Sequence, residues 1–332
     1  MRRLTAMVFL VLGAGLVLSA RDKRLDNVSG LWEVRVLSKV GFIDASGRLA
    51  VPARYEEAGF FSEGLCPVRQ GEMWGYIDIS GRTAIPARFE RAGPFSEGMA
   101  AVGLRGRMGF IDRTGRMLSM PAVEEAGLFQ EGLARVKAGG LWGFIDGQGR
   151  RAIPARFEEA GDFFEGLAAV RIQGRWGHID REGRVVIPPR FEGASEFQEG
   201  RAVVRTPSGA SYIDKRGSAV FQGRVFQEAQ RFSDGLAAVR LPPSGRFGFI
   251  DAEGKAVIMA LYDEALPFNE GLAAVRRGER WGYVDKQGAV AVELRFERAD
   301  YFINGLARVV RSGRDVYIDR GGRIVWEPGM IR

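Results

Sequence analysis

Hydrophobic and polar positions alternate along this chain in short runs, each shorter than an ordinary helix. In residues 65–69 apolar side chains end at an arginine, and in residues 74–78 aromatic and aliphatic side chains end at an aspartate. Residues 83–85 form a third run, which we expect to stop at Pro86 because proline donates no hydrogen bond to a strand ladder. The pattern predicts three short β-strands separated by tight turns.

The three runs recur along the chain with a fixed period. A tetrad that reads glycine, aromatic residue, isoleucine and aspartate, or a close variant of it, ends at Asp44, Asp78, Asp112, Asp146, Asp180, Asp214, Asp251, Asp285 and Asp319. Successive aspartates are 34 residues apart, except for 37 residues between Asp214 and Asp251. A second signature, which begins with Gly30-Leu31, runs in phase with the first. Nine units therefore fill residues 30–328 as one continuous array.

Each unit contains glycines with distinct expected roles. The turn after the second run reads Asp-x-x-Gly, as in residues 78–81, so we expect the aspartate to accept local N–H groups and the glycine to adopt a positive φ. The glycine inside the second run, such as Gly75, is expected to let a neighbouring backbone or ring approach closely. Residues 89–98 are expected to carry the chain to the next unit as a compact turn with buried phenylalanines.

The arrangement of the units is predicted from these elements. Tetratricopeptide helical hairpins share a 34-residue period, but the repeated glycines and prolines exclude helix pairs here. We predict an all-β tandem array of nine three-stranded repeats, stacked as an open, twisted or superhelical array. The alternative is a closed β-propeller, whose blades usually have four strands and a longer repeat. The first unit begins with its own first strand, so no strand exchange between the two ends is evident.

The repeated residues resemble a known family. Trp-Gly-Tyr-Ile-Asp at residues 74–78, Ile-Pro-Ala-Arg-Phe at 85–89 and Phe-Ser-Glu-Gly-Met at 95–99 are similar to the bacterial WG-repeat, or KWG-repeat, family. The resemblance implies interaction modules of secreted, surface or multidomain proteins, and no common enzymatic activity. The signature residues are Trp74, Gly75, Asp78, Trp142, Gly143, Asp146, Trp176, Gly177, Asp180, Trp281, Gly282 and Asp285.

The tryptophans of this signature have two interpretations. We expect them to pack between repeats, and a stacking platform for sugars or bases is the alternative. Other units replace the tryptophan with Val40, Met108, Ala210, Phe247 and Asp315, which predicts looser packing at those units, most of all around the sixth and ninth.

The N-terminus indicates export. Two arginines precede a mostly apolar run at residues 4–20, which is typical of a signal segment. We expect residues 1–20 to be a cleaved signal peptide, with an uncleaved membrane anchor as the alternative. Residues 21–29 are a polar linker and residues 329–332 a C-terminal tail. The predicted location is therefore the periplasm, the cell envelope or the extracellular space.

The residue types argue against catalysis and bound cofactors. The chain has one histidine and one cysteine. His178 stands where other units carry Phe or Tyr, and Cys66 stands where others carry Ala, so both are expected to be packed residues. Carboxylates such as Asp78 and Glu90 recur in every unit, whereas a catalytic pair is needed once. A calcium loop needs six or more oxygen ligands, which the Asp-x-x-Gly turns do not offer. We predict no catalytic, cofactor or metal site; a hydrolytic site in the irregular sixth and seventh units is the alternative.

The charge favours an anionic partner. The net charge is +7, and arginines recur at two positions of the unit. One series ends the first strand and the other follows the proline region; they comprise Arg69, Arg171, Arg205, Arg240 and Arg276, and Arg54, Arg88, Arg156, Arg190 and Arg295. Equivalent residues of an array line up, so these arginines form stripes suited to carboxylates or phosphates unless each one pairs with an acidic neighbour.

The break in periodicity is the candidate interaction surface. Insertions occur near residues 222–224 and within residues 241–246, and insertions in repeat arrays map to surface loops. Arg205, Arg224, Arg240 and Arg246 are the candidate contacts, and a drifted repeat without a role is the alternative. We predict a non-enzymatic extracytoplasmic scaffold for a protein or an anionic envelope polymer. A nucleic-acid binder would also suit the basic charge, but the export signal counts against it.

Overall fold

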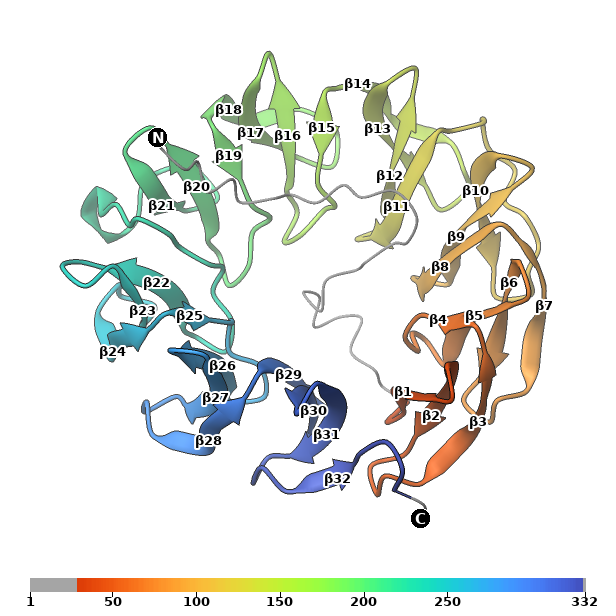
Figure 1. The fold of residues 1–332 in the computed structure, drawn as a ribbon. Coiled ribbons are helices and arrows are strands. Elements are labelled where there is room, and N and C mark those ends of the chain that lie inside the picture. Colours follow the sequence, from red (N-terminus) through yellow and green to blue (C-terminus); the bar gives the residue numbers. More distant parts are fainter. Residues whose placement is uncertain (1–28, 331–332) are drawn as a thin grey trace, which may run out of the picture.

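The chain forms a closed ring of nine small antiparallel sheets around a central axis (Figure 1). The structure is a computed structural model and describes residues 29–330. Within those residues there is no α-helix, and the one helical element is a short 3₁₀ turn, η2 (Phe221–Gly223). The predicted all-β array of nine repeats is confirmed. The ring is a nine-bladed β-propeller, which was the alternative to the open stack.

The nine sheets are numbered here as blades 1 to 9 in chain order. Blade 1 contains β1 (Trp32–Val36), β2 (Lys39–Ile43) and β3 (Leu49–Tyr55). Blade 2 contains β4 (Glu57–Ala58), β5 (Leu65–Gln70), β6 (Met73–Asp78) and β7 (Thr83–Phe89). Blade 3 contains β8 (Arg91–Ser96), β9 (Met99–Leu104) and β10 (Arg107–Asp112). Blade 4 contains β11 (Glu125–Gln130), β12 (Leu133–Ala138), β13 (Leu141–Asp146) and β14 (Arg151–Phe157). Blade 5 contains β15 (Glu159–Ala160), β16 (Ala168–Ile172), β17 (Arg175–Ile179) and β18 (Val185–Phe191). Blade 6 contains β19 (Gly193–Ala194), β20 (Ala202–Thr206) and β21 (Gly209–Ile213). Blade 7 contains β22 (Ala237–Leu241), β23 (Arg246–Ile250) and β24 (Ala256–Tyr262). Blade 8 contains β25 (Glu264–Ala265), β26 (Leu272–Arg277), β27 (Arg280–Asp285) and β28 (Val290–Phe296). Blade 9 contains β29 (Arg298–Ile303), β30 (Leu306–Arg311), β31 (Arg314–Asp319) and β32 (Ile324–Trp326).

Within residues 29–330, seven blades have an inner strand that the sequence pattern did not predict, and with it blades 2, 4, 5, 8 and 9 have four strands. In blade 2 it is β4, where Glu57 pairs with Arg69 of β5. This strand lies in the segment that we expected to be only a compact turn, and in four blades it has just two residues. Such short inner strands let a four-stranded blade fit into 34 residues. The expectation that a propeller needs a longer repeat was therefore wrong.

The outer strand also extends further than predicted. β7 continues through Pro86 to Phe89, with Trp74 opposite Phe89 and Tyr76 opposite Ile85. Three residues centred on Ala87 therefore bulge opposite Gly75. Proline is tolerated here because β7 is an outermost strand and needs hydrogen bonds on only one side.

The bulge explains the glycine of the signature. A Cβ atom on Gly75 would lie 2.6 Å from the Ile85 carbonyl oxygen and 2.7 Å from the Ala87 nitrogen. Gly143 has the same relation to Ile153 and Ala155. The predicted close approach is confirmed, and the approaching group is the backbone of the outer strand.

The Asp-x-x-Gly turns form as predicted. In blade 2 Asp78 accepts the backbone N–H groups of Ser80 at 2.9 Å and of Arg82 at 3.0 Å. Gly81 has a φ of +79°. The corresponding aspartate accepts equivalent bonds in all nine blades.

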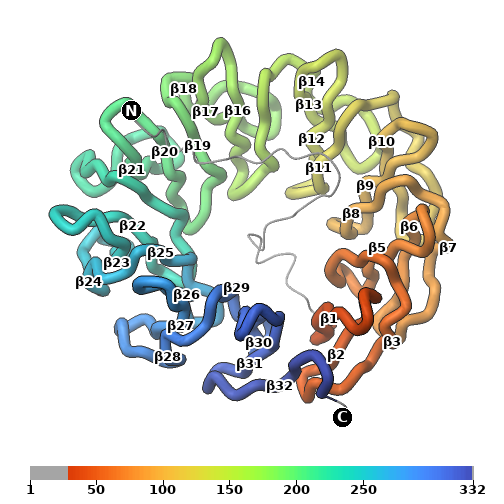
Figure 2. Tube along the Cα trace, in the orientation of Figure 1, coloured from red at the N-terminus to blue at the C-terminus, as the bar shows by residue number. Residues whose placement is uncertain are grey.

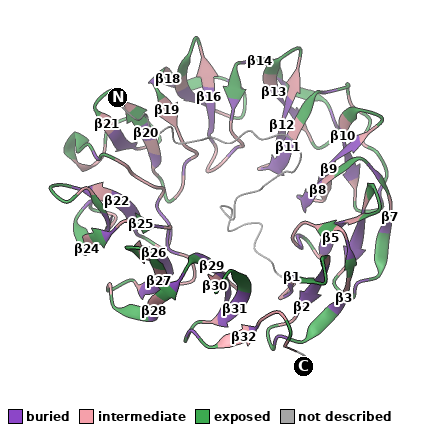
Figure 3. Cartoon of the chain, viewed as in Figure 1, coloured by how far each residue is buried: buried purple, intermediate pink, exposed green. Residues whose placement is uncertain are grey.

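The hydrophobic core lies between blades. Tyr76 and Phe89 of blade 2 pack with Phe95 and Val102 of blade 3, and the rings of Tyr76 and Phe95 meet edge to face at 5.0 Å. Figure 3 shows buried residues in every blade around the ring. Each blade is therefore stabilised mainly by the neighbours on either side of it.

The ring closes by side-chain packing between the first and last blades, which lie side by side in Figure 2. Trp32, Val34 and Ile43 form one buried cluster with Leu306, Tyr317 and Trp326. The Trp32 indole N–H donates to the Ile303 carbonyl at 3.1 Å, and the Tyr317 hydroxyl donates to the Glu33 carbonyl at 2.7 Å. The two blades share no strand. The predicted open stack is therefore wrong, because apolar faces at the two ends of the array cover each other.

The N-terminal predictions lie outside the described part of the chain. The signal segment at residues 1–20 and all of the linker except Ser29 belong to residues that the structure does not describe. Within residues 29–330, no helix has the length and apolar character needed to cross a membrane.

Candidate functional site

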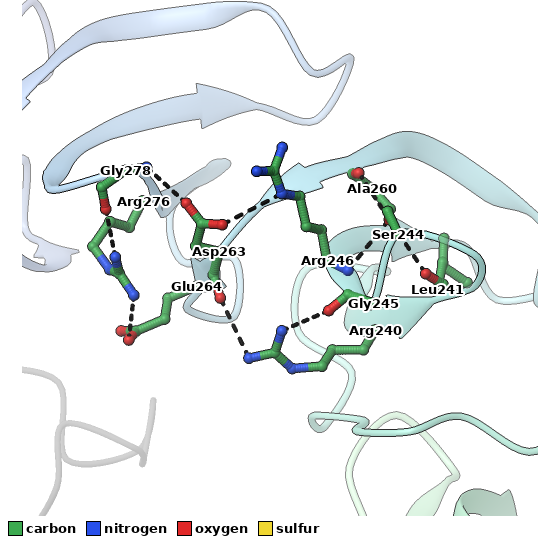
Figure 4. A network of polar contacts seen from close by, with 10 residues as sticks. All are labelled: Arg240, Leu241, Ser244, Gly245, Arg246, Ala260, Asp263, Glu264, Arg276 and Gly278. Carbon is green, nitrogen blue, oxygen red and sulfur yellow. Dashed lines mark hydrogen bonds and ion pairs between the residues drawn. The ribbon is translucent and has the colours of Figure 1, made fainter.

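The larger of the two insertions, at residues 241–246, lies at the connection between β22 and β23 of blade 7 (Figure 4), and the smaller one lies at η2. The longer connection folds back on its own blade: the Gly245 N–H donates to the Leu241 carbonyl at 3.0 Å. The Ser244 hydroxyl lies 3.4 Å from the Ala260 carbonyl of β24. The insertion therefore forms an ordered hairpin at the edge of blade 7.

The Arg240 side chain contacts this hairpin and connects it to the rest of the fold. Its guanidinium donates to the Gly245 carbonyl at 2.6 Å and lies 3.2 Å from the Glu228 carboxylate. It also stacks 4.4 Å from the ring centre of Phe247, the residue that replaces the signature tryptophan in this blade. Because these contacts lie within the fold, the primary role of Arg240 is to position the hairpin.

Arg246 lies at the start of β23 and is more accessible. Its guanidinium is 3.3 Å from Asp263, and its side chain is 46% exposed. Asp263 also accepts the Gly278 N–H at 2.6 Å, so the contact network continues from blade 7 into blade 8. Figure 4 shows Arg240 and Arg246 approaching Asp263 from the hairpin side.

The other two predicted residues belong to blade 6. Arg224 donates to the Gly254 carbonyl at 3.2 Å and lies over the ring of Phe226. Arg205 is exposed on β20, opposite Gly193. The structure therefore brings Arg240 and Arg246 together at one hairpin, whereas Arg205 and Arg224 lie in the preceding blade.

The two arginine series bind within the ring. The first series ends the strand that was predicted as the first of each unit, for example β5 in blade 2. In this series Arg69 lies 2.6 Å from Glu57, and Arg171 and Arg276 pair with glutamates in the same way. The series after the proline region donates to the Asp-x-x-Gly turn of the next blade: the acceptors of Arg54, Arg88, Arg156, Arg190 and Arg295 are the carbonyls of Gly81, Gly115, Gly183, Gly217 and Gly322. These carbonyl contacts were not foreseen, and they link blades 1, 2, 4, 5 and 8 to the blade that follows each of them.

A ring of carboxylates also links neighbouring blades, and sequence reasoning missed it. Glu63 adopts a φ of +52°, and its carboxylate accepts the Gly98 N–H of the next blade at 3.0 Å. The same bond is made by Glu97, Glu131, Glu165, Glu199, Asp234 and Glu270. A charge-assisted bond offsets the strain of a left-handed non-glycine residue. The signal in the sequence was an acidic residue before the glycine of the second signature in seven of the nine units; Ser29 and Asn304 stand there in the first and last units.

The signature tryptophans are half-buried in the seams between blades. Trp74, Trp142, Trp176 and Trp281 each pack against a buried cluster of their own seam. Trp142 also lies beneath Arg135 and Lys137, whose charged groups are 5.2 and 5.7 Å from its ring. These contacts are those of packing residues.

His178 occupies a fully buried position between blades 5 and 6. Its Nε2 atom lies 2.9 Å from the Ser195 carbonyl, so Nε2 carries the proton, and Nδ1 has no partner. Its ring meets Phe197 edge to face at 4.9 Å. Burial lowers the pKa of His178 to about 4, because the apolar seam disfavours the imidazolium ion. His178 therefore packs as an aromatic residue, as predicted.

The lowered pKa of His178 predicts a dependence of stability on pH. Between pH 6.5 and 5 the unfolded chain binds a proton at this residue that the folded chain does not bind. The free energy of unfolding should therefore fall by about 2 kcal/mol over that interval, since one pKa unit corresponds to about 1.4 kcal/mol. His178→Phe should remove this part of the pH dependence in urea unfolding curves.

His178→Tyr is the matched control for that measurement. Tyrosine occupies the equivalent position in blades 2 and 8, where Tyr76 and Tyr283 donate to carbonyls of the following blade. The two variants should share one pH profile between pH 6.5 and 5. A wild-type profile that coincides with theirs would contradict a neutral buried histidine.

Cys66 is fully buried, and burial raises the pKa of its thiol well above the usual value. Its sulfur lies 3.3 Å from the Gly59 carbonyl. Within residues 29–330 no three or more His, Cys, Asp or Glu side chains gather where they would hold a metal ion.

The family follows from a comparison with known repeats. The model of the WG containing repeat matches eight consecutive stretches, at residues 41–74, 74–107, 108–142, 142–176, 176–206, 211–241, 247–281 and 281–314. The chain belongs to the WG-repeat family. In this WG-repeat protein each matched stretch begins in one blade and ends in the next, so a sequence repeat is offset from a blade.

Solved structures show similarity of fold. A eukaryotic initiation factor is similar over 90% of this chain and 95% of its own, with a TM-score of 0.64 and 10% identity. Weaker matches include AztD from Citrobacter koseri, at a TM-score of 0.43, 12% identity and coverage of 90% and 93%. Dihydro-heme d1 dehydrogenase NirN is similar at a TM-score of 0.44, 14% identity and coverage of 93% and 75%. No curated protein sequence matches the chain.

Proposed function

We propose that this WG-repeat propeller is a non-enzymatic scaffold, exported from the cytoplasm, that binds an anionic partner in the cell envelope. The observation that carries the proposal is the charge of a set of equivalent hairpins, such as β5–β6 in blade 2 and β22–β23 in blade 7. Their exposed tips carry Arg105, Arg107, Arg175, Arg246, Arg277, Arg280, Arg311 and Arg314. The acidic residues at these tips are Glu72 and Glu279.

The position of these hairpins supports a shared surface. Equivalent loops of a propeller emerge on one face of the ring, so the arginines form a basic rim around that face. Acidic residues at the base of the hairpins have partners inside the fold: Glu56 and Glu158 accept the N–H groups of Gly71 and Gly174. The excess positive charge at the tips favours carboxylate or phosphate groups of an envelope polymer or of an acidic protein.

The blade 7 hairpin is the proposed centre of the contact. It is the longest of these hairpins, and its fixed shape lowers the entropy that binding must overcome. Arg246 extends from it with about half of its side chain exposed. Arg205, at the end of β20 in the neighbouring blade, is also an exposed residue.

The proposal predicts the effect of removing the insertion. Replacing residues 241–246 with the four-residue sequence of residues 138–141 from blade 4 should weaken binding of polyglutamate and dextran sulfate about tenfold, since each lost charge-assisted contact contributes about 1.5 kcal/mol. Binding should be measured by biolayer interferometry at low and physiological salt, with neutral dextran as the reference ligand. Thermal unfolding should show that the grafted ring still folds.

Arg175→Ser provides a control, because this arginine occupies the equivalent hairpin of blade 5, where its nearest carboxylate is Glu192 at 3.8 Å. It should weaken binding much less than the graft. Cell fractionation of the chain with and without residues 1–20 tests the export proposal. A folded graft that binds both polyanions as tightly as the wild type would exclude the blade 7 hairpin as the contact.

A further inference from the structure

Blade 3, like blade 6, lacks the outer strand that the other seven blades of the described ring have. Six blades place a buried aliphatic residue at the same point of the outer strand, seven residues after the turn aspartate: Val51, Ile85, Ile153, Ile187, Ile258 and Val292. In blade 3 this position is Ser119, which is exposed. The outer segment of blade 3 has therefore lost the side chain that anchors it to the next blade.

The polarity of this segment is inverted. Leu118 and Met120, the neighbours of Ser119, are apolar and half-buried, whereas the matching residues of blade 2, Ala84 and Pro86, are exposed. Two isolated bridges, Ile111 to Met117 and Met108 to Val123, hold the ends of the segment in the register of blade 2, but the regular pairing between them is lost.

Methionine side chains fill part of the vacated space. In blade 2 the backbone of the outer strand lies over Gly75, but in blade 3 the Met117 methyl group lies over Gly109, 2.7 Å from where a Cβ would stand. The result is a cleft of about 500 Å³ beside Met108. This volume falls within the range of about 300–1,000 Å³ that is usual for small-molecule sites.

The lining of the cleft combines apolar and cationic groups. Its apolar wall comprises Leu104, Met108, Met117, Leu118 and Met120. Methionine adapts its shape to apolar ligands because its chain is unbranched and its sulfur is polarisable.

The cationic groups of the lining lie in the hairpin between β9 and β10. Arg105 and Arg107 are the only charged side chains that line the cleft, and both residues are exposed. No ion pair involves either of them within residues 29–330. The nearby Glu90 accepts the Gly106 N–H at 2.9 Å, so its carboxylate already has a partner.

We propose that this cleft binds a medium-chain fatty acid, with the hydrocarbon chain against the methionines and the carboxylate at Arg105 and Arg107. A guanidinium matches a carboxylate in geometry and charge, and a carboxylate without a hydrocarbon chain, such as acetate, gains no burial against the apolar wall. The site lies in one blade; it shares Arg105 and Arg107 with the basic rim but does not involve the hairpin of blade 7.

The test is isothermal titration of the full-length chain with dodecanoate below its micelle concentration. One molecule should bind per chain, and dodecan-1-ol should bind at least tenfold more weakly because it lacks the charge. The double variant Arg105→Ser, Arg107→Ser should weaken dodecanoate binding at least tenfold. Arg175→Ser, at the blade 5 equivalent of Arg107, should leave the affinity unchanged.

A rebuilt blade tests the cleft itself. Replacing residues 117–121 with the sequence of residues 83–87 restores the aliphatic anchor and the bulged strand, so it should abolish dodecanoate binding without lowering the melting temperature. Three results would overturn the proposal: no binding by the wild type, equal binding of the alcohol, or undiminished binding by the folded rebuilt variant. Binding that the arginine substitutions leave unchanged would overturn the placement of the carboxylate.

Discussion

Replacing Trp32 with alanine should lower the free energy of unfolding by about 4 kcal/mol, the usual loss for a large buried aromatic side chain. Trp32 is 6% exposed and lies in the seam between blades 1 and 9, where its indole N–H donates to the Ile303 carbonyl. Other blades carry alanine or Cys66 at this position. The tryptophan therefore provides apolar volume that is specific to the closing seam.

Urea unfolding measures this loss, and small-angle scattering measures whether the ring stays closed. Tyr317→Phe is the matched control, because it removes one hydrogen bond across the same seam and keeps the ring system. It should cost about 1 kcal/mol. A Trp32→Ala variant as stable as the control would mean that the terminal blades do not hold each other in solution.

Replacing Gly75 with valine should cost about 3 kcal/mol of unfolding free energy. A Cβ at this position would lie 2.6 to 2.8 Å from three backbone atoms of β7, so the outer strand must move away. The loss should extend to the neighbouring blades, because Ile85 and Phe89 of β7 belong to the cluster shared with blade 3. Thermal unfolding and amide hydrogen exchange of blades 2 and 3 measure both effects.

Gly147→Val is the control for Gly75→Val. Gly147 lies in the Asp-x-x-Gly turn of blade 4, has no positive φ and has no atom within 4 Å of a Cβ built on it. Other blades carry Ala45 or Ile79 at this position. The control should change stability by less than about 0.5 kcal/mol. Equal effects of the two substitutions would show that the close approach at Gly75 is not what stabilises the blade.

The candidate interaction surface was predictable in location but not in detail. An insertion breaks the period in the sequence, so its position at residues 241–246 could be read directly. The partners of Arg240 and Arg224 could not, because Gly245 and Gly254 offer backbone carbonyls, and every residue carries such a carbonyl. A residue pattern therefore does not show which backbone carbonyl accepts a hydrogen bond.

The cleft in blade 3 had a weak signal in the sequence. Met108 replaces the signature tryptophan, and this replacement predicted looser packing at its unit, although the strongest effect was expected at the sixth and ninth units. The decisive change lies at Ser119, where the loss of an aliphatic anchor releases the outer strand. Its importance appears only when nine structurally equivalent positions are superimposed.

The sequence by itself determined the repeat, its strands and its turns. These features depend on local rules: side chains alternate along a strand, Asp78 caps its own turn, and Gly75 permits close approach. Nine in-phase copies also determined that the fold is an array in which each unit contacts mainly its neighbours.

Only the tertiary structure decided that the array closes. Closure depends on the angle between successive blades, and that angle is set by seam contacts such as the one between Tyr76 and Phe95, which belong to different units. The inner strands have as few as two residues, too short to produce an alternating pattern. The small angles between successive blades add up around the ring until Trp32 packs in one cluster with Tyr317. The residue pattern of a single repeat does not give this total angle.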